Sequence, residues 1–323
     1  MTNSNKQNST TPTPSTNITP STPLTQYTFH NMTLTWLDGA DTTTDAGTLF
    51  GPVPKAVWSR YYPHNDQNQL AEMTDPILIQ YNNKNYLIDA SLATQRMDAK
   101  QRRNNGVLND NNMLESLKEL NIKPEDIHVI LMTHMHNDHA GGLTTLDPET
   151  NEYHSTFPNA TIYMSGIEWK EVRNPNPRTR GTYLKENWEA IQNQVVTFNQ
   201  SIEIAPGIAM HHTGGHSNGH SIIKLTQNED VMLNMGDIFL NHAQKNPLWV
   251  AAVDDYPMDT IQAKTKWLNE AYENGYKFFF YHDPYYAVAQ YDTKGEQIIH
   301  HMERAKPPHI PWTDQQDRRI PHN

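Results

Sequence analysis

THMHNDHAGG, residues 133–142, is the stretch of this sequence that decides the fold and the chemistry we expect. It directly follows IHVILMT, an apolar and β-branched run of strand length. Because residues two apart in extended backbone project to the same side, His134 and His136 can converge on one ion. After the chain turns, Asp138 and His139 can face a second ion. The H-x-H-x-D-H spacing therefore predicts a metal-binding loop at the end of a strand.

Three further residues of ligand type follow apolar runs elsewhere in the chain. His216 lies in HTGGHSNGHS, Asp237 ends VMLNMGD, and His282 follows KFFFY. The sequence has 17 histidines and no cysteine, so disulfides, iron–sulfur clusters and thiolate metal sites are excluded. Because buried and unpaired imidazoles are costly without a cation, this pattern favours a metal site built from imidazole and carboxylate at the rim of a sheet.

Charge and hydropathy exclude other classes of function. The net charge is −11, which argues against nucleic-acid binding, because phosphate recognition needs clustered lysine and arginine. No stretch approaches the roughly 18 continuous apolar residues of a membrane span. The first residues, MTNSNKQNSTT, lack the pattern of a secretory signal. We therefore expect a cytoplasmic protein whose partner is neither a nucleic acid nor a membrane.

The organisation of the chain is predicted as one domain between two tails. Residues 1–25 are rich in Thr, Ser, Asn and Pro and are predicted to be disordered, residues 26–305 form the domain, and residues 306–323 form an irregular tail. Alternating strands and helices predict a mixed-sheet α/β domain. The predicted strands are 76–81, 85–90, 127–133, 160–165, 221–226, 230–235 and 276–281, and the predicted helices are 111–120 and 257–275.

These residues resemble the metallo-β-lactamase superfamily, from about Thr33 to about Tyr291. The resemblance implies an αββα sandwich, with two mixed β-sheets flanked by helices and a dinuclear metal site at the sheet edge. Two divalent cations are implied, with Zn²⁺ expected and Mn²⁺, Co²⁺ or Fe²⁺ also compatible with such ligands. By position, the first cation is expected on His134, His136 and His216, the second on Asp138, His139 and His282, and Asp237 is expected to bridge them.

Within the superfamily, the chain is most similar to the quorum-quenching N-acyl-homoserine lactonase branch of YtnP-like proteins. The matching segments are FGPVPKAVW (50–58), GDIFLNHAQKNPLWV (236–250) and YHDP (281–284). The similarity implies hydrolysis of a lactone or ester by a hydroxide held between the cations, with Asp138 as the catalytic residue that moves its proton. It also implies a possible homodimer. Two departures are Leu240, where many lactonases have Tyr, and Asp89-Ala90-Ser91 in place of Asp-Thr-Gly.

Alternatives remain open at this point. A thioesterase of the glyoxalase II kind would be expected to recruit basic side chains, and a phosphoesterase or a non-catalytic metal-binding module could share the ligands. His220 is either adjacent to the site or a structural histidine. Six residues are candidates for the substrate pocket, although core packing is the competing interpretation for the aromatic ones. They are Phe50, Trp58, Phe239, Leu240, His242 and Trp249.

Overall fold

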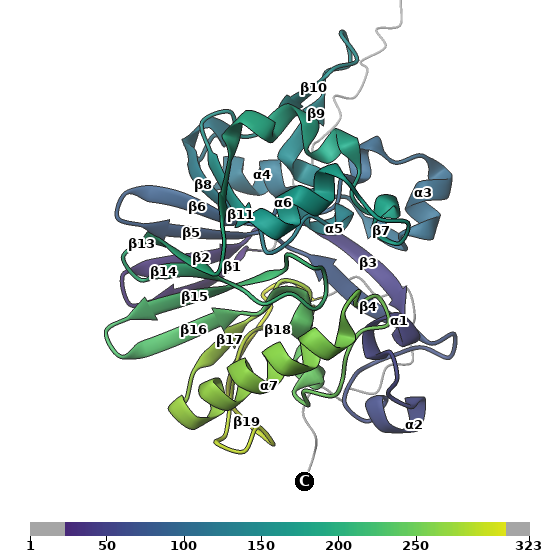
Figure 1. Cartoon of the computed structure of the whole chain (residues 1–323), viewed down its shortest axis with the longest axis vertical. Helices are drawn as coiled ribbons and strands as arrows, with labels where there is room; N and C mark the ends of the chain where they lie inside the picture. Colours follow the sequence, from purple (N-terminus) through teal and green to yellow (C-terminus); the bar gives the residue numbers. More distant parts are fainter. Residues whose placement is uncertain (1–22, 308–323) are drawn as a thin grey trace, which may run out of the picture.

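Two β-sheets packed face to face form the centre of the computed structural model, which describes residues 23–307 (Figure 1). Both sheets are mixed and helices cover their outer faces, so the predicted sandwich is confirmed. The two predicted tails lie almost entirely outside the described residues. Strand β1 begins at Thr25, the last residue assigned to the first tail. No helix within the described residues has the length and apolar character needed to span a membrane.

The N-terminal sheet has seven strands in the order β1-β2-β5-β6-β8-β11-β12. The pairs from β1 to β6 are antiparallel, and those from β6 to β12 are parallel. The predicted hairpin of β5 and β6 is confirmed, with Asn82 and Asn83 at positive φ in its turn. The strands are Thr25–Phe29, Met32–Trp36, Ile77–Tyr81, Lys84–Ile88, Ile127–Leu131, Thr161–Ser165 and Val195–Phe198.

The C-terminal sheet also has seven strands, in sequential order from β13 to β19. Its pairs are antiparallel except for β16 with β17, which is parallel. The parallel pair exists because the long helix α7 connects these two strands across the outer face of the sheet. The strands are Ser201–Ala205, Ile208–His212, Ser221–Gln227, Asp230–Asn234, Lys277–Phe279, Tyr286–Tyr291 and Ile298–Glu303.

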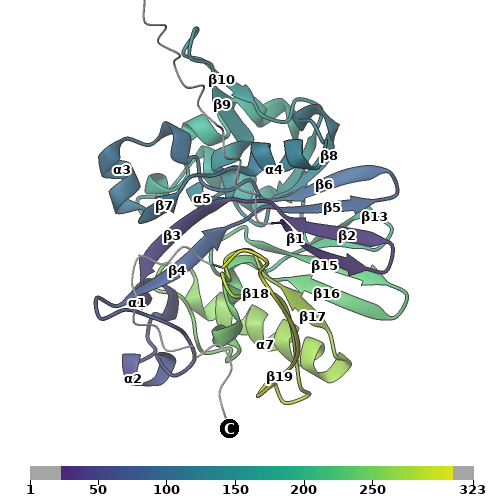
Figure 2. The same ribbon diagram turned by 180° about the vertical axis from the view of Figure 1, so that it is seen from behind.

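Three apolar layers hold the sandwich together. The central layer joins the two sheets through residues such as Ile79 and Met210, and the outer layers lie under the helices. Helix α7 begins at Pro257 and ends before Gly275, whose φ of +66° is the left-handed conformation that glycine allows. Figure 2 shows α7 against one sheet and α4 against the other. The α-helices are α1 Ala46–Phe50, α2 Lys55–Trp58, α3 Ala99–Asn104, α4 Met113–Glu119, α5 Asn137–Ala140, α6 Gly166–Arg173 and α7 Pro257–Asn274.

A third, smaller sheet flanks the sandwich and consists of β3, β4 and β7, with β3 in the centre (Figure 1). These strands are Ala40–Asp45, Gln69–Thr74 and Val107–Asn109. A two-stranded ribbon is formed by β9 Thr144–Leu146 and β10 Tyr153–Ser155. Short 3₁₀ turns complete the chain at Thr94–Arg96, Pro124–Asp126, Gly141–Leu143, Thr179–Gly181, Lys185–Asn187, Glu189–Gln194, Gly236–Phe239 and His242–Gln244.

Arg304, just after β19, fastens the end of the chain to the loop that carries His282. Its buried guanidinium donates to the carbonyls of Phe280, Tyr281 and Asp283 at 2.9, 3.1 and 3.0 Å. A further nitrogen lies 3.1 Å from a carboxylate oxygen of Asp75. The guanidinium thereby satisfies the loop carbonyls and a buried carboxylate together, which fixes the loop relative to the sheet.

We expect Arg304→Met to lower the free energy of unfolding by about 3–5 kcal/mol, because it leaves the buried Asp75 carboxylate without its cation and removes a donor from each of three carbonyls, of which that of Phe280 keeps a hydrogen bond from Trp36. Urea unfolding followed by circular dichroism measures the change. Lys294→Met, which removes an exposed cation, is the matched control and should change stability little. A loss of stability no larger than that of the control would contradict the anchoring role.

Candidate metal centre

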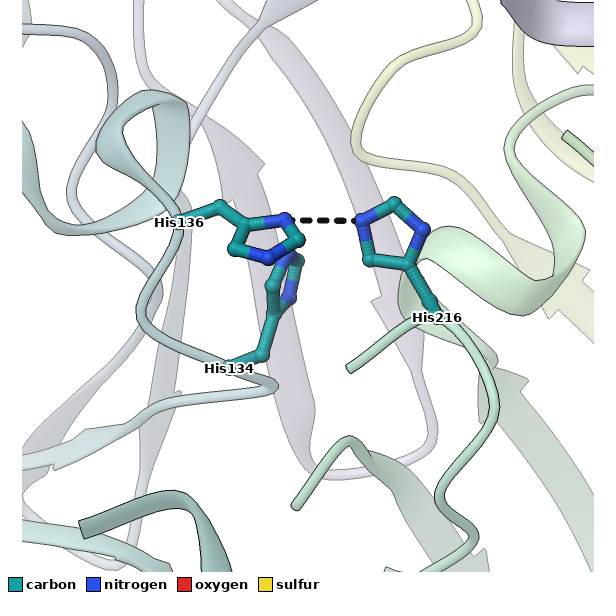
Figure 3. A group of neighbouring side chains, drawn as sticks. All are labelled: His134, His136 and His216. Carbon is teal, nitrogen blue, oxygen red and sulfur yellow. Dashed lines mark hydrogen bonds between the residues drawn. The ribbon is translucent and has the colours of Figure 1, made fainter. Parts of the chain in front are cut away.

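Three histidine side chains from two loops point toward one another at the edge of the sandwich (Figure 3). His134 and His136 lie in the loop after β8, and His216 lies in the loop between β14 and β15. One nitrogen of each ring lies within 4.8 Å of the others, and His136 Nδ1 is 2.9 Å from His216 Nε2. The three residues that the sequence assigned to one cation are thus brought together.

A second group contains two histidines and two aspartates. Asp138 and His139 lie on α5, Asp237 lies in the 3₁₀ turn after β16, and His282 follows β17. One ligand atom of each residue lies within 4.8 Å of the others. The Nε2 atoms of His139 and His282 are 3.0 Å apart.

Asp237 lies between the two groups, with one carboxylate oxygen toward each. Its Oδ2 is 3.2 Å from His216 Nε2 and 3.8 Å from His134 Nε2. Its Oδ1 is 3.3 Å from His139 Nε2 and 3.2 Å from His282 Nε2. This arrangement is the one expected of a carboxylate that bridges two cations.

The hydrogen bonds of the outer ring nitrogens show that the residues present fit a metal. His282 Nδ1 lies 2.8 Å from the carbonyl oxygen of Met73, which can only accept, so Nδ1 carries the proton. His139 Nδ1 similarly faces Asp89 Oδ2 at 2.8 Å. In the neutral rings, the two Nε2 atoms therefore direct lone pairs at each other across 3.0 Å, and a shared cation removes that repulsion.

The outer ring nitrogen of His216 is also held by an acceptor. Its Nδ1 lies 2.9 Å from Asp254 Oδ1, which leaves Nε2 directed at the site. Among the described residues, the buried His134 Nε2 and Asp237 Oδ1 also have no hydrogen-bond partner. Unpaired buried polar atoms of this kind are rare in proteins. Their convergence at one point indicates a cation-binding centre.

Burial and mutual proximity set the charges of these groups. Burial, and then the neighbouring imidazoles, lower the pKa of both His134 and His136 well below the usual value, which keeps them in the ligand form. Burial alone would raise the pKa of Asp237, but the surrounding histidines, with His139 foremost, hold it well below its usual range. Burial alone would lower the pKa of His139, His216 and His282, but the Asp237 carboxylate raises all three, that of His282 to about 9. The centre therefore holds an ionised carboxylate that attracts positive charge, and a metal cation would compete with protons for these rings.

Several residues that position the ligands were not assigned by sequence reasoning. Asp254, the partner of His216, follows the apolar run WVAAV (249–253), which the structure does not form into a strand and which could have marked this carboxylate. Tyr281 donates its hydroxyl to the carbonyl of Asp138 at 2.9 Å, and its ring stacks on that of His139 with centroids 4.6 Å apart. Its place at the end of an apolar run predicts only a strand residue. The buried Glu72 carboxylate lies 3.6 Å from His282 Nδ1, and burial raises its pKa to about 7.

The turn at Asp89-Ala90-Ser91 holds a carboxylate against His139, although its sequence departs from Asp-Thr-Gly. Asp89 accepts hydrogen bonds from the backbone and the hydroxyl of Thr133, as well as facing His139. Ser91 has a φ of +63°, where glycine would be unstrained, and its hydroxyl pairs with Thr74 at 2.8 Å. The carboxylate that orients His139 is therefore retained, and a buried hydrogen bond supports the strained residue.

His220 supports the centre through the backbone. Its Nε2 accepts a hydrogen bond from the backbone N–H of Asp237 at 3.1 Å, and its Nδ1 pairs with the Thr213 hydroxyl at 2.8 Å. His220 is therefore in contact with a ligand-type residue without pointing a free nitrogen at the site. Of the two interpretations left open for it, the structure favours the one adjacent to the site.

A cavity of about 1090 Å³ opens onto both groups and is lined in part by His136, Asp138, His216 and Asp237. Of the six pocket candidates, Leu240 lines it, and the other five lie elsewhere. Phe50, Trp58 and Phe239 are buried in the core under α7, where the rings of Phe50 and Trp58 stack at 5.0 Å. The stacking buries both faces of these aromatic residues in the core, so they are not available to a cavity wall.

The remaining two pocket candidates are also placed away from the cavity. His242 is buried, with its Nδ1 2.6 Å from Asp283 Oδ2. Trp249 is half-buried and packs edge-on against Phe50 with centroids 5.9 Å apart. The sequence could not separate these residues from the pocket, because they neighbour Asp237 along the chain and only the packing shows which way they point.

The family to which the chain belongs follows from this geometry and from comparison with known proteins. The sequence model of the family described as the metallo-beta-lactamase superfamily matches residues 71–282, which contain all seven ligand-type residues. The chain belongs to the metallo-β-lactamase superfamily.

Individual relatives show which members of the superfamily the chain is similar to. The chain is 40% identical to a probable metal-dependent hydrolase from Staphylococcus aureus of known structure, over 86% of this chain and 99% of that one, with a TM-score of 0.82. The dizinc quorum-quenching lactonase AidC shares the fold, with 16% identity, a TM-score of 0.70 and coverage of 89% and 98%. An N-acyl homoserine lactonase from Bacillus cereus is 30% identical over 124 residues, 36% of this chain. That match spans 40% of the Bacillus enzyme, less than half its length.

We expect Asp89→Asn to weaken metal binding about 10- to 100-fold, because the amide can no longer accept the His139 proton with a full negative charge. Competition with a chromophoric chelator measures the affinity, and circular dichroism verifies that the variant is folded. Glu229→Gln removes an exposed carboxylate in a turn and serves as the control. Equal affinities for the two variants would show that Asp89 does not orient the ligand.

Lys264 of α7 fixes the segment that precedes Asp254. Its buried Nζ donates to the carbonyl of Trp249 at 2.6 Å. Burial lowers the pKa of this ammonium to about 7, although the nearby Asp254 carboxylate opposes the shift. The folded chain therefore releases this proton at a lower pH than the unfolded chain.

The stability of the protein should consequently depend on pH through Lys264. Between pH 7 and pH 10.5 the unfolded chain binds the proton that the folded chain has lost, so stability rises with pH by up to about 1.4 kcal/mol per unit. Lys264→Met should remove this rise, whereas Lys266→Met, on the exposed face of α7, should keep it. Urea unfolding across this range tests the difference, and parallel pH profiles for wild type and Lys264→Met would refute it.

Proposed function

We propose that this protein is a dinuclear metal-dependent hydrolase that opens lactone rings, with N-acyl-homoserine lactones as its substrate class. The observation that carries the proposal is the convergence of four imidazole Nε2 atoms on the Asp237 carboxylate, which lines the cavity. Membership of the superfamily, the Staphylococcus aureus relative and the partial matches to N-acyl homoserine lactonases support it.

The residues would divide between two cations as the sequence predicts. His134, His136 and His216 would hold one, the group of Asp138, His139 and His282 would hold the other, and Asp237 would contact both. When bound, two divalent cations supply Lewis acidity toward a carbonyl oxygen and acidify a water molecule. Imidazole and carboxylate ligands favour zinc, and manganese, cobalt and iron are also suited to them.

Asp138 would move the proton during hydrolysis. Both carboxylates of the centre line the cavity, but the Asp138 side chain is 39% exposed, whereas that of Asp237 is 5% exposed. The Tyr281 hydroxyl holds the Asp138 backbone in place. When water adds to the lactone carbonyl and the ring C–O bond breaks, Asp138 can accept a proton from the water and pass it to the leaving oxygen, giving a hydroxy acid.

Metal removal and refilling test the proposal. We expect two ions per chain, loss of lactone hydrolysis after chelation, and recovery with Zn²⁺, Co²⁺ or Mn²⁺. Asp237→Ala should lower lactone hydrolysis by at least about a hundredfold, because it removes the one carboxylate that faces both groups. Elemental analysis and proton release on ring opening are the measurements, with Glu229→Gln as the control.

Parallel assays separate the alternatives that share these ligands. Thioesters, phosphodiesters and acyclic esters are tested beside the lactones with the same preparation. Equal lactone hydrolysis with and without metal would refute the mechanism. Activity confined to thioesters or phosphodiesters would show that the site catalyses one of those reactions instead. Fewer than two bound ions per chain, together with no hydrolysis, would indicate a metal-binding module.

A further inference from the structure

The cavity wall beyond the ligand-type residues is rich in hydroxyl and amide groups. It comes from β3 and the start of α1, from residues 67–74, from the end of α3 and the turn after it (103–106), and from residues 178–182 and 252–255. Apolar side chains are a minority of the lining residues and comprise Leu49, Leu92, Leu240, Ala252 and Val253. The uncharged polar side chains of the first two segments are Thr42, Thr43, Thr44, Thr48, Gln67, Gln69 and Thr74, and the charged ones are Asp45 and Glu72.

Some of these polar groups are available to a ligand. Thr42 donates its hydroxyl to the Glu72 carbonyl, and Gln69 pairs with Asn65. By contrast, the side chains of Thr44, Thr48 and Gln67 have no hydrogen-bond partner anywhere in residues 23–307. All three are at least partly exposed to the cavity. They can therefore donate to and accept from a bound molecule without breaking an existing bond.

The aromatic side chains that could have formed an apolar wall are used elsewhere. Phe50 and Trp58 belong to segments beside this wall, yet they stack in the core beneath it. An apolar wall would raise the affinity for the substrate about fourfold for each CH₂ added to its chain. A hydroxyl- and amide-lined wall gives less, because a methylene chain laid on it strips water from polar groups and leaves them unpaired.

We infer that the substituent of the substrate is hydrophilic: short, or bearing a hydroxyl group near its acyl carbonyl, rather than a long alkyl chain. This inference rests on the proposed lactonase function and specifies its substrate. Thr44, Thr48 and Gln67 determine the preference by hydrogen bonding the substituent, while the ligand-type residues act on the ring.

A chain-length series tests the inference with the metal-loaded protein. The probes are butanoyl, hexanoyl and decanoyl homoserine lactones, each with and without a β-hydroxyl group. We expect kcat/KM to change by less than about tenfold from butanoyl to decanoyl, where fourfold per CH₂ would give more than a thousandfold. At equal length, the β-hydroxyl should raise kcat/KM by about threefold or more.

Variants of similar side-chain size test whether the wall residues cause the preference for a β-hydroxyl group. Thr44→Val combined with Thr48→Val should bring the β-hydroxyl preference close to one and should steepen the dependence on chain length. Thr197→Val, on the exposed part of β12, is the control and should leave both ratios unchanged. Gln67→Leu, at an exposed position, provides a second variant that does not depend on the packing of β3.

The outcomes distinguish this inference from the function on which it rests. Hydrolysis that rises steeply toward decanoyl, or a β-hydroxyl preference that survives in both wall variants, would overturn the inference and leave the lactonase intact. Failure to open any lactone in the series would overturn the proposed function, and the inference with it.

Discussion

The convergence of imidazole nitrogens on one buried carboxylate is the constraint on which this structure depends. Asp237 offers one oxygen to each group of ligand-type residues, and the outer nitrogens of His139, His216 and His282 are each held by an acceptor. Those acceptors fix which nitrogen carries the proton and so which lone pair faces the centre. Unpaired lone pairs held at this separation are costly for the chain alone, and bound cations would relieve that cost.

The sandwich makes this convergence possible because each sheet contributes a different part. The motif at 134–139 follows a strand of the N-terminal sheet, whereas Asp237 and His282 follow strands of the C-terminal sheet. Neither half presents both sides of the centre by itself. The apolar layer between the sheets, and the Arg304 guanidinium that fastens the His282 loop, therefore maintain distances of about 3 Å between residues nearly 150 positions apart.

Sequence patterns predicted the strands and helices well where the local pattern has a physical cause. Alternation and apolar runs predicted β5, β6, β8 and β16, and the Pro257 and Gly275 boundaries predicted α7. The same reasoning could not place Phe50, Trp58 and Phe239, because an aromatic residue near a motif can line a cavity or pack behind it. Asp254 and Tyr281 were missed since a residue that only orients a ligand needs no characteristic spacing.

The sequence by itself determined the ligand chemistry and the family. Seven histidine and aspartate residues at strand ends, with no cysteine in the chain, admit a centre of imidazole and carboxylate and little else. Only the tertiary structure decided which acceptors orient those ligands and which side chains line the cavity. The physical reason is that ligand type follows from local spacing, whereas the wall around Thr44 and Thr48 results from long-range packing that turns the aromatic side chains into the core.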